Sequence, residues 1–185
     1  MTLIAEQGFS ATTVEEIAER AGVAKGTVYY NFAGKTELFE EVLRDGVDRL
    51  AAELRRADEA ALERGADAVG RLSAAALAGL VFIERNPSLT RLLMAELWRT
   101  HRAWHATVVS ARQQAVDVVE RVLHEGVKDG ELDPALDVEL TAGALVGMIL
   151  VGALDWLSFH PERPLREVHL ALSRLLHGRV RVAAG

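Results

Sequence analysis

The chain has 185 residues, half of them apolar, with only four prolines, no cysteine and a formal net charge of −6. The missing cysteines exclude disulfides, thiolate metal sites and cysteine nucleophiles, and favour a cytoplasmic location. The acidic balance argues against nonspecific nucleic-acid binding by the whole chain, although local charge decides what a small surface binds. The abundance of Ala, Leu, Glu and Arg predicts an all-α fold.

Glycines divide the N-terminal residues into short predicted helices. Gly8, Gly22 and Gly34 each follow an apolar-periodic run and can take the positive φ that ends a helix. The spacing predicts helices over 2–7, 14–21 and 25–31. Thr13, with Glu16 three residues later, has the pattern of a capping box at the start of the second helix.

The second and third predicted helices have the spacing of a helix-turn-helix, with Gly22 in the turn. The third presents donors and aromatic rings of the kind that contact phosphates, base edges and thymine methyls. Lys35 opens the next helix, where its ammonium and the free backbone N–H groups can hold a phosphate. Capping is the first role of Thr12 and Thr13, and phosphate contact is a second.

Residues 8–43 resemble the DNA-binding signature of the TetR family of bacterial regulators. The resemblance is carried by Ala21-Gly22-Val23, by residues 26–32 (Gly-Thr-Val-Tyr-Tyr-Asn-Phe) and by residues 35–38 (Lys-Thr-Glu-Leu). It implies a three-helix DNA-binding head, a ligand-binding body and a dimer built from the last two long helices. The predicted DNA-binding residues are Thr12, Thr13, Lys25, Gly26, Thr27, Tyr29, Tyr30, Asn31 and Lys35.

The sequence departs from the family pattern at three places. Met1 falls inside the expected first helix, which leaves open a longer start. Ala24 stands where a serine or threonine commonly caps the third helix, a loss of about 1 kcal/mol if nothing substitutes for it. Asn31 replaces the commoner histidine but is still a hydrogen-bond donor.

The predicted head is formally acidic, because residues 1–44 hold seven glutamates against Arg20, Lys25, Lys35 and Arg44. Few basic residues allow few phosphate contacts, so we expect DNA affinity to fall only shallowly with salt. The slope of log Kobs against log salt concentration measures this, and a steep slope contradicts it.

Beyond the head, helical spacing continues over 35–62, 69–84, 88–98, 103–127, 135–159 and 165–176, which brings the total to about nine helices. Prolines 87, 134, 161 and 164 lie at the breaks. We expect a DNA-binding domain over 1–44 and a ligand-binding and dimerisation domain over 45–185. The uncharged run 140–154 is shorter than the roughly 20 residues that a bilayer needs, so it predicts a buried helix and no membrane.

The middle helices contain a candidate ligand site. Trp and Met side chains at helical spacing suit an apolar pocket, and packing without a cavity is the alternative. His101 and His105, four residues apart, have no partner carboxylate nearby except Glu96, so we expect ordinary histidines and neither a metal nor a cofactor. The predicted lining residues are Phe82, Leu93, Met94, Leu97, Trp98 and Trp104.

The last two helices carry a candidate dimer interface. Gly143, Gly147 and Gly152 each cost a helix about 1 kcal/mol, which close helix approach can offset. With the amphipathic run 165–176 they predict half of an intersubunit four-helix bundle, and a helix in the core of one chain is the alternative. The predicted interface residues are Gly143, Gly147, Val151, Leu154, Val168, Leu172 and Leu175.

The sequence thus predicts a ligand-responsive DNA-binding regulator. By analogy with the family we expect a repressor, released from a palindromic operator by a small, mostly apolar molecule. No nucleophile with a base, no paired carboxylates and no glycine-rich phosphate loop indicate an enzyme, so no catalytic residue is expected. The alternative is a small-molecule-binding helical dimer that has lost DNA binding, which the acidic head suggests.

Overall fold

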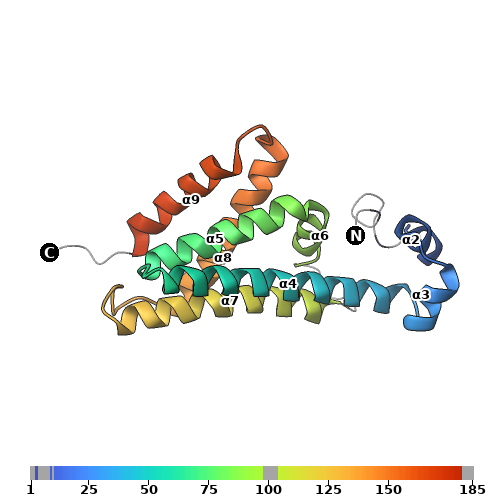
Figure 1. Cartoon of the computed structure of the whole chain (residues 1–185), viewed down its shortest axis with the longest axis horizontal. Coiled ribbons are helices and arrows are strands. Elements are labelled where there is room, and N and C mark those ends of the chain that lie inside the picture. Colours follow the sequence, from blue (N-terminus) through green and yellow to red (C-terminus); the bar gives the residue numbers. More distant parts are fainter. Residues whose placement is uncertain (1–2, 4–8, 10, 98–103, 181–185) are drawn as a thin grey trace. The chain divides into compact units, whose positions relative to one another are not determined.

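The computed structural model describes residues 3, 9, 11–97 and 104–180, and in these ranges all regular structure is helical (Figure 1). Eight helices are described there: α2 Val14–Ala21, α3 Lys25–Asn31, α4 Lys35–Glu63, α5 Ala68–Arg85, α6 Pro87–Leu97, α7 His105–Lys128, α8 Val138–Phe159 and α9 Leu165–Val180. The predicted all-α class is confirmed. The predicted helix over 2–7 lies outside the described residues, apart from Leu3.

The predicted bounds of α2 and α3 are confirmed, and most of the other bounds differ by one or two residues. The start of α8 was predicted three residues too early. Asp137 caps this helix, because its side chain accepts a hydrogen bond from the Leu140 N–H at 3.0 Å. Asp133 accepts from the Ala135 N–H at 2.8 Å and holds a turn before the cap, so the helix does not begin at Pro134.

The chain forms two compact units. The first combines residues 1–48 with 86–111, and the second combines 49–85 with 112–185. The long helices α4 and α7 each contribute to both units. The first break lies close to the predicted boundary after residue 44, but 86–111 joins the N-terminal residues, which the sequence did not predict. The functional boundary after residue 44 stays a prediction.

In the first unit, a small apolar core fixes α2 against α3 and the start of α4. Val14, Ala18, Val28 and Leu38 are buried together, with Ile17, Phe32 and Val42 packed around them. Gly22 takes the predicted left-handed conformation, with φ at 68°, and its N–H is bonded to the carbonyls of Ala18 and Glu19. This turn sets the direction in which α3 leaves α2.

A cluster of three aromatic rings also lies in the first unit. Trp104, just before α7, packs on Phe9 and Phe39, with ring centroids 4.4 and 4.7 Å away, and the two phenylalanines are 5.1 Å apart. Trp104 and Phe39 are almost fully buried. The cluster therefore ties Trp104 to α4 and to Phe9.

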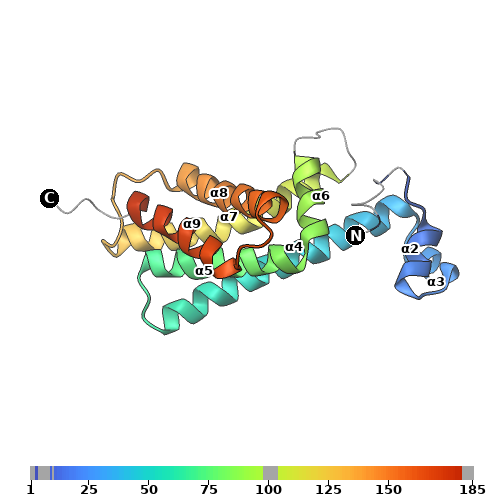
Figure 2. The ribbon, with the colours of Figure 1, turned by 90° about the horizontal axis from the view of Figure 1, so that it is seen from above.

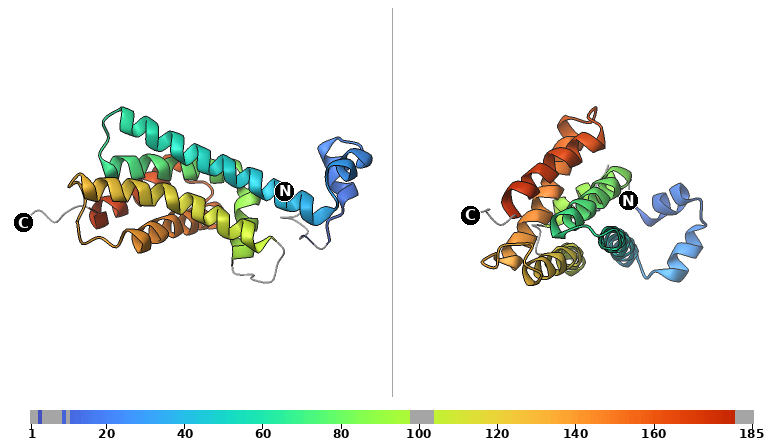
Figure 3. Two further views of the ribbon diagram at one scale, coloured as in Figure 1. Left: turned by 90° about the horizontal axis from the view of Figure 1, so that it is seen from below. Right: turned by 60° about the vertical axis from the view of Figure 1, so that its left-hand side comes forward.

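In the second unit, α5 is the central helix. It packs against α9 and α8, which also contact each other (Figure 2). Leu80, Ile83 and Ala153 form one buried cluster, while Val69, Leu72 and Leu123 belong to another between α5 and α7. The second half of α4 lies beside α7, where Leu54 meets Ala115 and Val118 (Figure 3).

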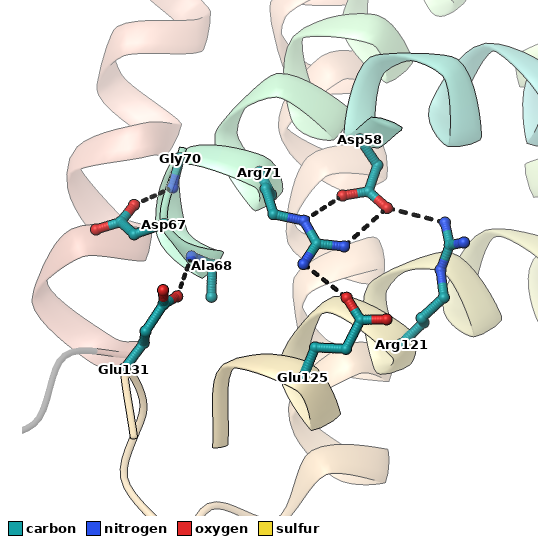
Figure 4. Close-up of polar contacts among 8 residues, drawn as sticks. All are labelled: Asp58, Asp67, Ala68, Gly70, Arg71, Arg121, Glu125 and Glu131. Carbon is teal, nitrogen blue, oxygen red and sulfur yellow. Dashed lines mark hydrogen bonds and ion pairs between the residues drawn. The ribbon is translucent and has the colours of Figure 1, made fainter. Parts of the chain in front are cut away.

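An ionic network centred on the buried pair Arg71 and Asp58 lies in the second unit (Figure 4). The Arg71 guanidinium donates to both carboxylate oxygens of Asp58, from Nε at 2.6 Å and from Nη2 at 3.1 Å. Its Nη1 lies 2.7 Å from Glu125, and Arg121 donates to Asp58 at 2.8 Å. The hydrogen bonds to Asp58 raise the pKa of Arg71 against the opposing effect of burial. The network joins α4, α5 and α7.

The helix α8 is longer than the uncharged run in the sequence. Within the described residues it is the one helix that is long and apolar enough to cross a membrane by length and composition. Core helices of soluble proteins meet the same criterion, so this is weak evidence for a membrane span. Only 22% of its most apolar window is buried within the chain, so the prediction of a buried helix is wrong for the single chain.

Replacing Thr13 by alanine is expected to lower the free energy of unfolding by about 1 kcal/mol. The capping box is present: Thr13 Oγ1 accepts from the Glu16 N–H, and Glu16 accepts from the Thr13 N–H at 2.7 Å. Chemical denaturation measures the change. Thr13→Ser keeps the acceptor and serves as control, and equal stability of the two variants would show that the cap contributes nothing.

Candidate nucleic-acid interface

The helix α3 buries one residue and exposes the rest. Val28 is buried in the apolar core of the first unit, which fixes the rotation of α3 about its own axis. Tyr30 is 90% exposed and Tyr29 46% exposed, and Lys25, Gly26 and Thr27 are also exposed. Asn31 is exposed as well, so all six predicted contact residues of α3 are accessible to a large polar partner.

Three side chains on this surface, Glu15, Lys25 and Tyr29, form a group that we call the Glu15 cluster. The Lys25 ammonium forms an ion pair with Glu15, and the Tyr29 hydroxyl lies 3.5 Å from the same carboxylate oxygen. Lys25 Nζ is also 5.6 Å from the centre of the Tyr29 ring. The hydrogen bond from Lys25 lowers the pKa of Glu15, and Glu15 raises that of Lys25. The sequence reasoning missed Glu15, although its spacing from Lys25 across the turn was available.

The other predicted contact residues fall into different environments. Thr13 is exposed at the start of α2. Thr12 is completely buried, so its side chain cannot contact a phosphate in this conformation. The Asn31 amide donates to the Thr27 carbonyl at 2.7 Å, and Ala24 gives α3 no side-chain cap. The Asn31 bond secures the end of α3 and leaves the residue exposed.

Lys35 lies at the start of α4, as predicted, but its ammonium points back to the segment before α2. It donates to the carbonyls of Phe9 at 2.7 Å and Thr12 at 2.8 Å, and lies 4.5 Å from the centre of the Phe9 ring. This arrangement gives Lys35 a structural role that the sequence did not suggest. Its phosphate contact stays a prediction.

The predicted ligand residues are divided between the two units. Phe82 is buried in the second unit, while Leu93 and Met94 on α6 are half-buried in the first. Trp104 packs in the aromatic cluster, which favours the alternative of packing for this residue. Trp98, His101 and the side chain of Leu97 lie outside the described residues.

The predicted dimer residues also separate into two groups. Val168 and Leu172 on α9 pack against the α5–α8 cluster of their own chain, and a Cβ on Gly152 would lie 3.2 Å from Leu172. Val151 and Leu175 are exposed, at 58% and 48%. Further exposed apolar residues that the sequence reasoning did not name are Leu140, Phe159 and Leu170.

The remaining predicted dimer positions lie on α8, where Gly143, Gly147 and Leu154 are half-buried. Arg112 covers Gly143, since a Cβ there would lie 2.9 Å from its guanidinium. A Cβ on Gly147 would meet nothing within 4 Å. Within the described part of the chain, nothing packs closely enough on Gly147 to offset the cost of a glycine in mid-helix.

Two protein-family models match this chain, one in its N-terminal part and one in its C-terminal part. Residues 1–42 match the model of the bacterial regulatory proteins of the tetR family. Residues 65–162 match that of the tetracyclin repressor-like C-terminal domain. The fold and the exposed α3 thus define a helix-turn-helix regulator.

Individual relatives agree with this class. The HTH-type transcriptional repressor KstR2 of Mycolicibacterium smegmatis is 31% identical over 75% of this chain and 66% of its own length. The HTH-type transcriptional activator FasR of the same organism is 32% identical over 86% of this chain and 68% of its own length. The chain belongs to the TetR family, a family of DNA-binding transcriptional regulators and not of enzymes. It spans about two thirds of the length of these relatives.

Solved structures share the fold across nearly the whole chain. The fatty acid degradation regulator FadR from Bacillus halodurans has a TM-score of 0.84 at 21% identity, covering 97% of this chain and 92% of its own. FadR from Bacillus subtilis, solved in complex with stearoyl-CoA, has a TM-score of 0.80 at 22% identity, covering 94% of this chain and 91% of its own. At these identities the likeness shows the fold alone.

Proposed function

We propose that this protein is a cytoplasmic repressor that binds a palindromic operator as a homodimer and is released by a small, mostly apolar molecule. The observation that carries the proposal is the exposed face of α3, on which Lys25, Thr27 and Tyr30 stand clear of the core that holds Val28. A helix so presented has the donors and the ring that major-groove recognition requires. Residues 1–44 are the proposed DNA-binding domain, and residues 45–185 bind the effector and dimerise.

The exposed residues of the last two helices support the homodimer. Val151 on α8 and Leu175 on α9 leave large apolar side chains in water, and Gly147 offers room for a close neighbour. Exposed apolar side chains on adjacent helices support an interface there, since burying them against a second copy is favourable. Two copies joined there, related by a two-fold axis, would place their α3 helices in successive major grooves about 34 Å apart.

The effector proposal rests on composition and on the relatives. Leu93 and Met94 supply half-buried apolar side chains on α6, and the B. subtilis FadR structure contains stearoyl-CoA, whose acyl chain is long and apolar. We propose that effector binding changes the tilt of α4 and hence the spacing of the two heads. A coupling of about 1 to 3 kcal/mol is enough for release. Repression is the family default, and FasR shows that the family name does not exclude activation.

The test is selection of duplexes from a random pool by the purified protein. We expect a palindromic sequence to be enriched, and Tyr30→Ala to bind it about tenfold more weakly, because one aromatic base contact is lost (~1.4 kcal/mol). Leu62→Ala removes an exposed apolar side chain elsewhere and is the control. If no sequence is enriched, a ligand-binding dimer that has lost DNA binding is favoured. Equal affinity of the Tyr30→Ala and wild-type proteins for an enriched duplex would show that Tyr30 on α3 makes no base contact.

A further inference from the structure

The Glu15 cluster joins the two helices of the helix-turn-helix on their exposed side. Glu15 lies in the first turn of α2, Lys25 is the first residue of α3, and Tyr29 follows one turn later. One carboxylate oxygen of Glu15 pairs with the ammonium and lies 3.5 Å from the phenol. A negative charge is thus held beside the lysine that is best placed to enter a DNA groove.

The fold does not need this ion pair. The packing of α2 on α3 depends on Val14, Ala18 and Val28, which are buried. The side chains of Lys25 and Glu15 are 57% and 47% exposed, and exposed pairs of this kind contribute little to stability. Stability therefore does not explain a carboxylate at this position.

The carboxylate changes which DNA groups Lys25 can bind. A free lysine is a point charge that serves any phosphate and so carries no sequence information. Glu15 accepts one of the three ammonium N–H groups and repels a phosphate that approaches it. The edge of a G·C pair is not repelled: O6 and N7 of guanine accept from the remaining N–H groups, and the cytosine amino group can donate to Glu15.

We propose that Glu15 is a specificity-determining residue, which directs Lys25 to a G·C base pair and away from the phosphate backbone. The proposal rests on the DNA-binding function proposed above and adds to it. It accounts for an acidic residue in a DNA-binding surface, because the charge lowers the affinity for other sequences while preserving the affinity for the operator. It also contributes to the shallow salt dependence expected from the head.

The experiment compares Glu15→Gln with Glu19→Gln. Glu19 lies one turn further along α2, is exposed and takes no part in the cluster, so both variants lose the same charge from the same helix. The probes are the duplex that the wild-type protein selects from a random pool and a scrambled duplex of equal composition. Binding is measured as a function of salt, and thermal unfolding verifies that the variants are folded.

For Glu15→Gln we expect about fivefold tighter binding to the scrambled duplex. Its salt slope should steepen by about 0.9, the contribution of one phosphate contact. The ratio of affinities for selected and scrambled duplex should therefore fall at least about fivefold. Repeated selection should lose the preference for one G·C pair in each half-site, whereas Glu19→Gln should keep the ratio and the preference.

Two results would overturn the inference. One is that Glu15→Gln and Glu19→Gln change the affinities, the salt slope and the selected sequence equally. Glu15 would then act only through the net charge of α2. The other is a full effect of Glu15→Gln in a Lys25→Met background, where no lysine is left to direct. Failure of the proposed function itself looks different, because the wild-type protein would then select no sequence at all.

Discussion

Replacing Arg71 by methionine is expected to lower the free energy of unfolding by about 3 to 5 kcal/mol. Asp58 is 1% exposed and, among the described residues, would keep Arg121 alone as partner, while Glu125 would lose its contact to α5. A buried carboxylate without its main counter-charge bears the cost of desolvation uncompensated. Denaturation with urea at neutral pH, followed by circular dichroism, measures the loss.

Arg56→Met is the matched control, since Arg56 pairs with Glu53 on the exposed face of α4 and its loss should change stability by less than about 0.5 kcal/mol. A second variant separates charge from packing. Changing Asp58→Leu together with Arg71→Met removes both buried charges and should recover most of the stability, because Arg121 and Glu125 can still meet one turn apart on α7. A double variant less stable than Arg71→Met would show that the network contributes more than charge balance.

Replacing Val151 by glutamate is expected to convert the proposed dimer into a monomer. Val151 is 58% exposed in the single chain and lies in the middle of α8, where a two-fold axis would bring it near its copy. Two carboxylates buried there without counter-charges would weaken association by about 2 to 5 kcal/mol, or roughly 30- to 4000-fold. Sedimentation velocity measures the change in mass, and binding to the selected duplex should weaken in parallel.

Leu62→Glu controls for the added charge, because Leu62 is similarly exposed but lies at the end of α4 and not on α8 or α9. It should leave the oligomeric state and DNA affinity unchanged. A dimeric Val151→Glu protein, with unchanged sedimentation, would place the interface elsewhere. If Val151→Glu and Leu62→Glu both became monomeric, the cause would be the added net charge and not the position of Val151.

The local signals in the sequence were the most reliable. Helices α2 and α3 begin and end as predicted, because Thr13 with Glu16 and Gly22 act through hydrogen bonds and φ angles within a few residues. The start of α8 was predicted early, because Pro134 was read as a first-turn proline while two nearby aspartates, Asp133 and Asp137, compete for the turn and the cap.

The sequence by itself determined the helical class, the helix-turn-helix and the family, since each depends on spacing along the chain. Only the tertiary structure decided that Lys35 bonds the carbonyls of Phe9 and Thr12, and that Trp104 packs in an aromatic cluster. It also paired Arg71 with Asp58 and Glu15 with Lys25. Such contacts depend on the rotation and crossing of helices, which core packing sets and which helical periodicity alone does not specify.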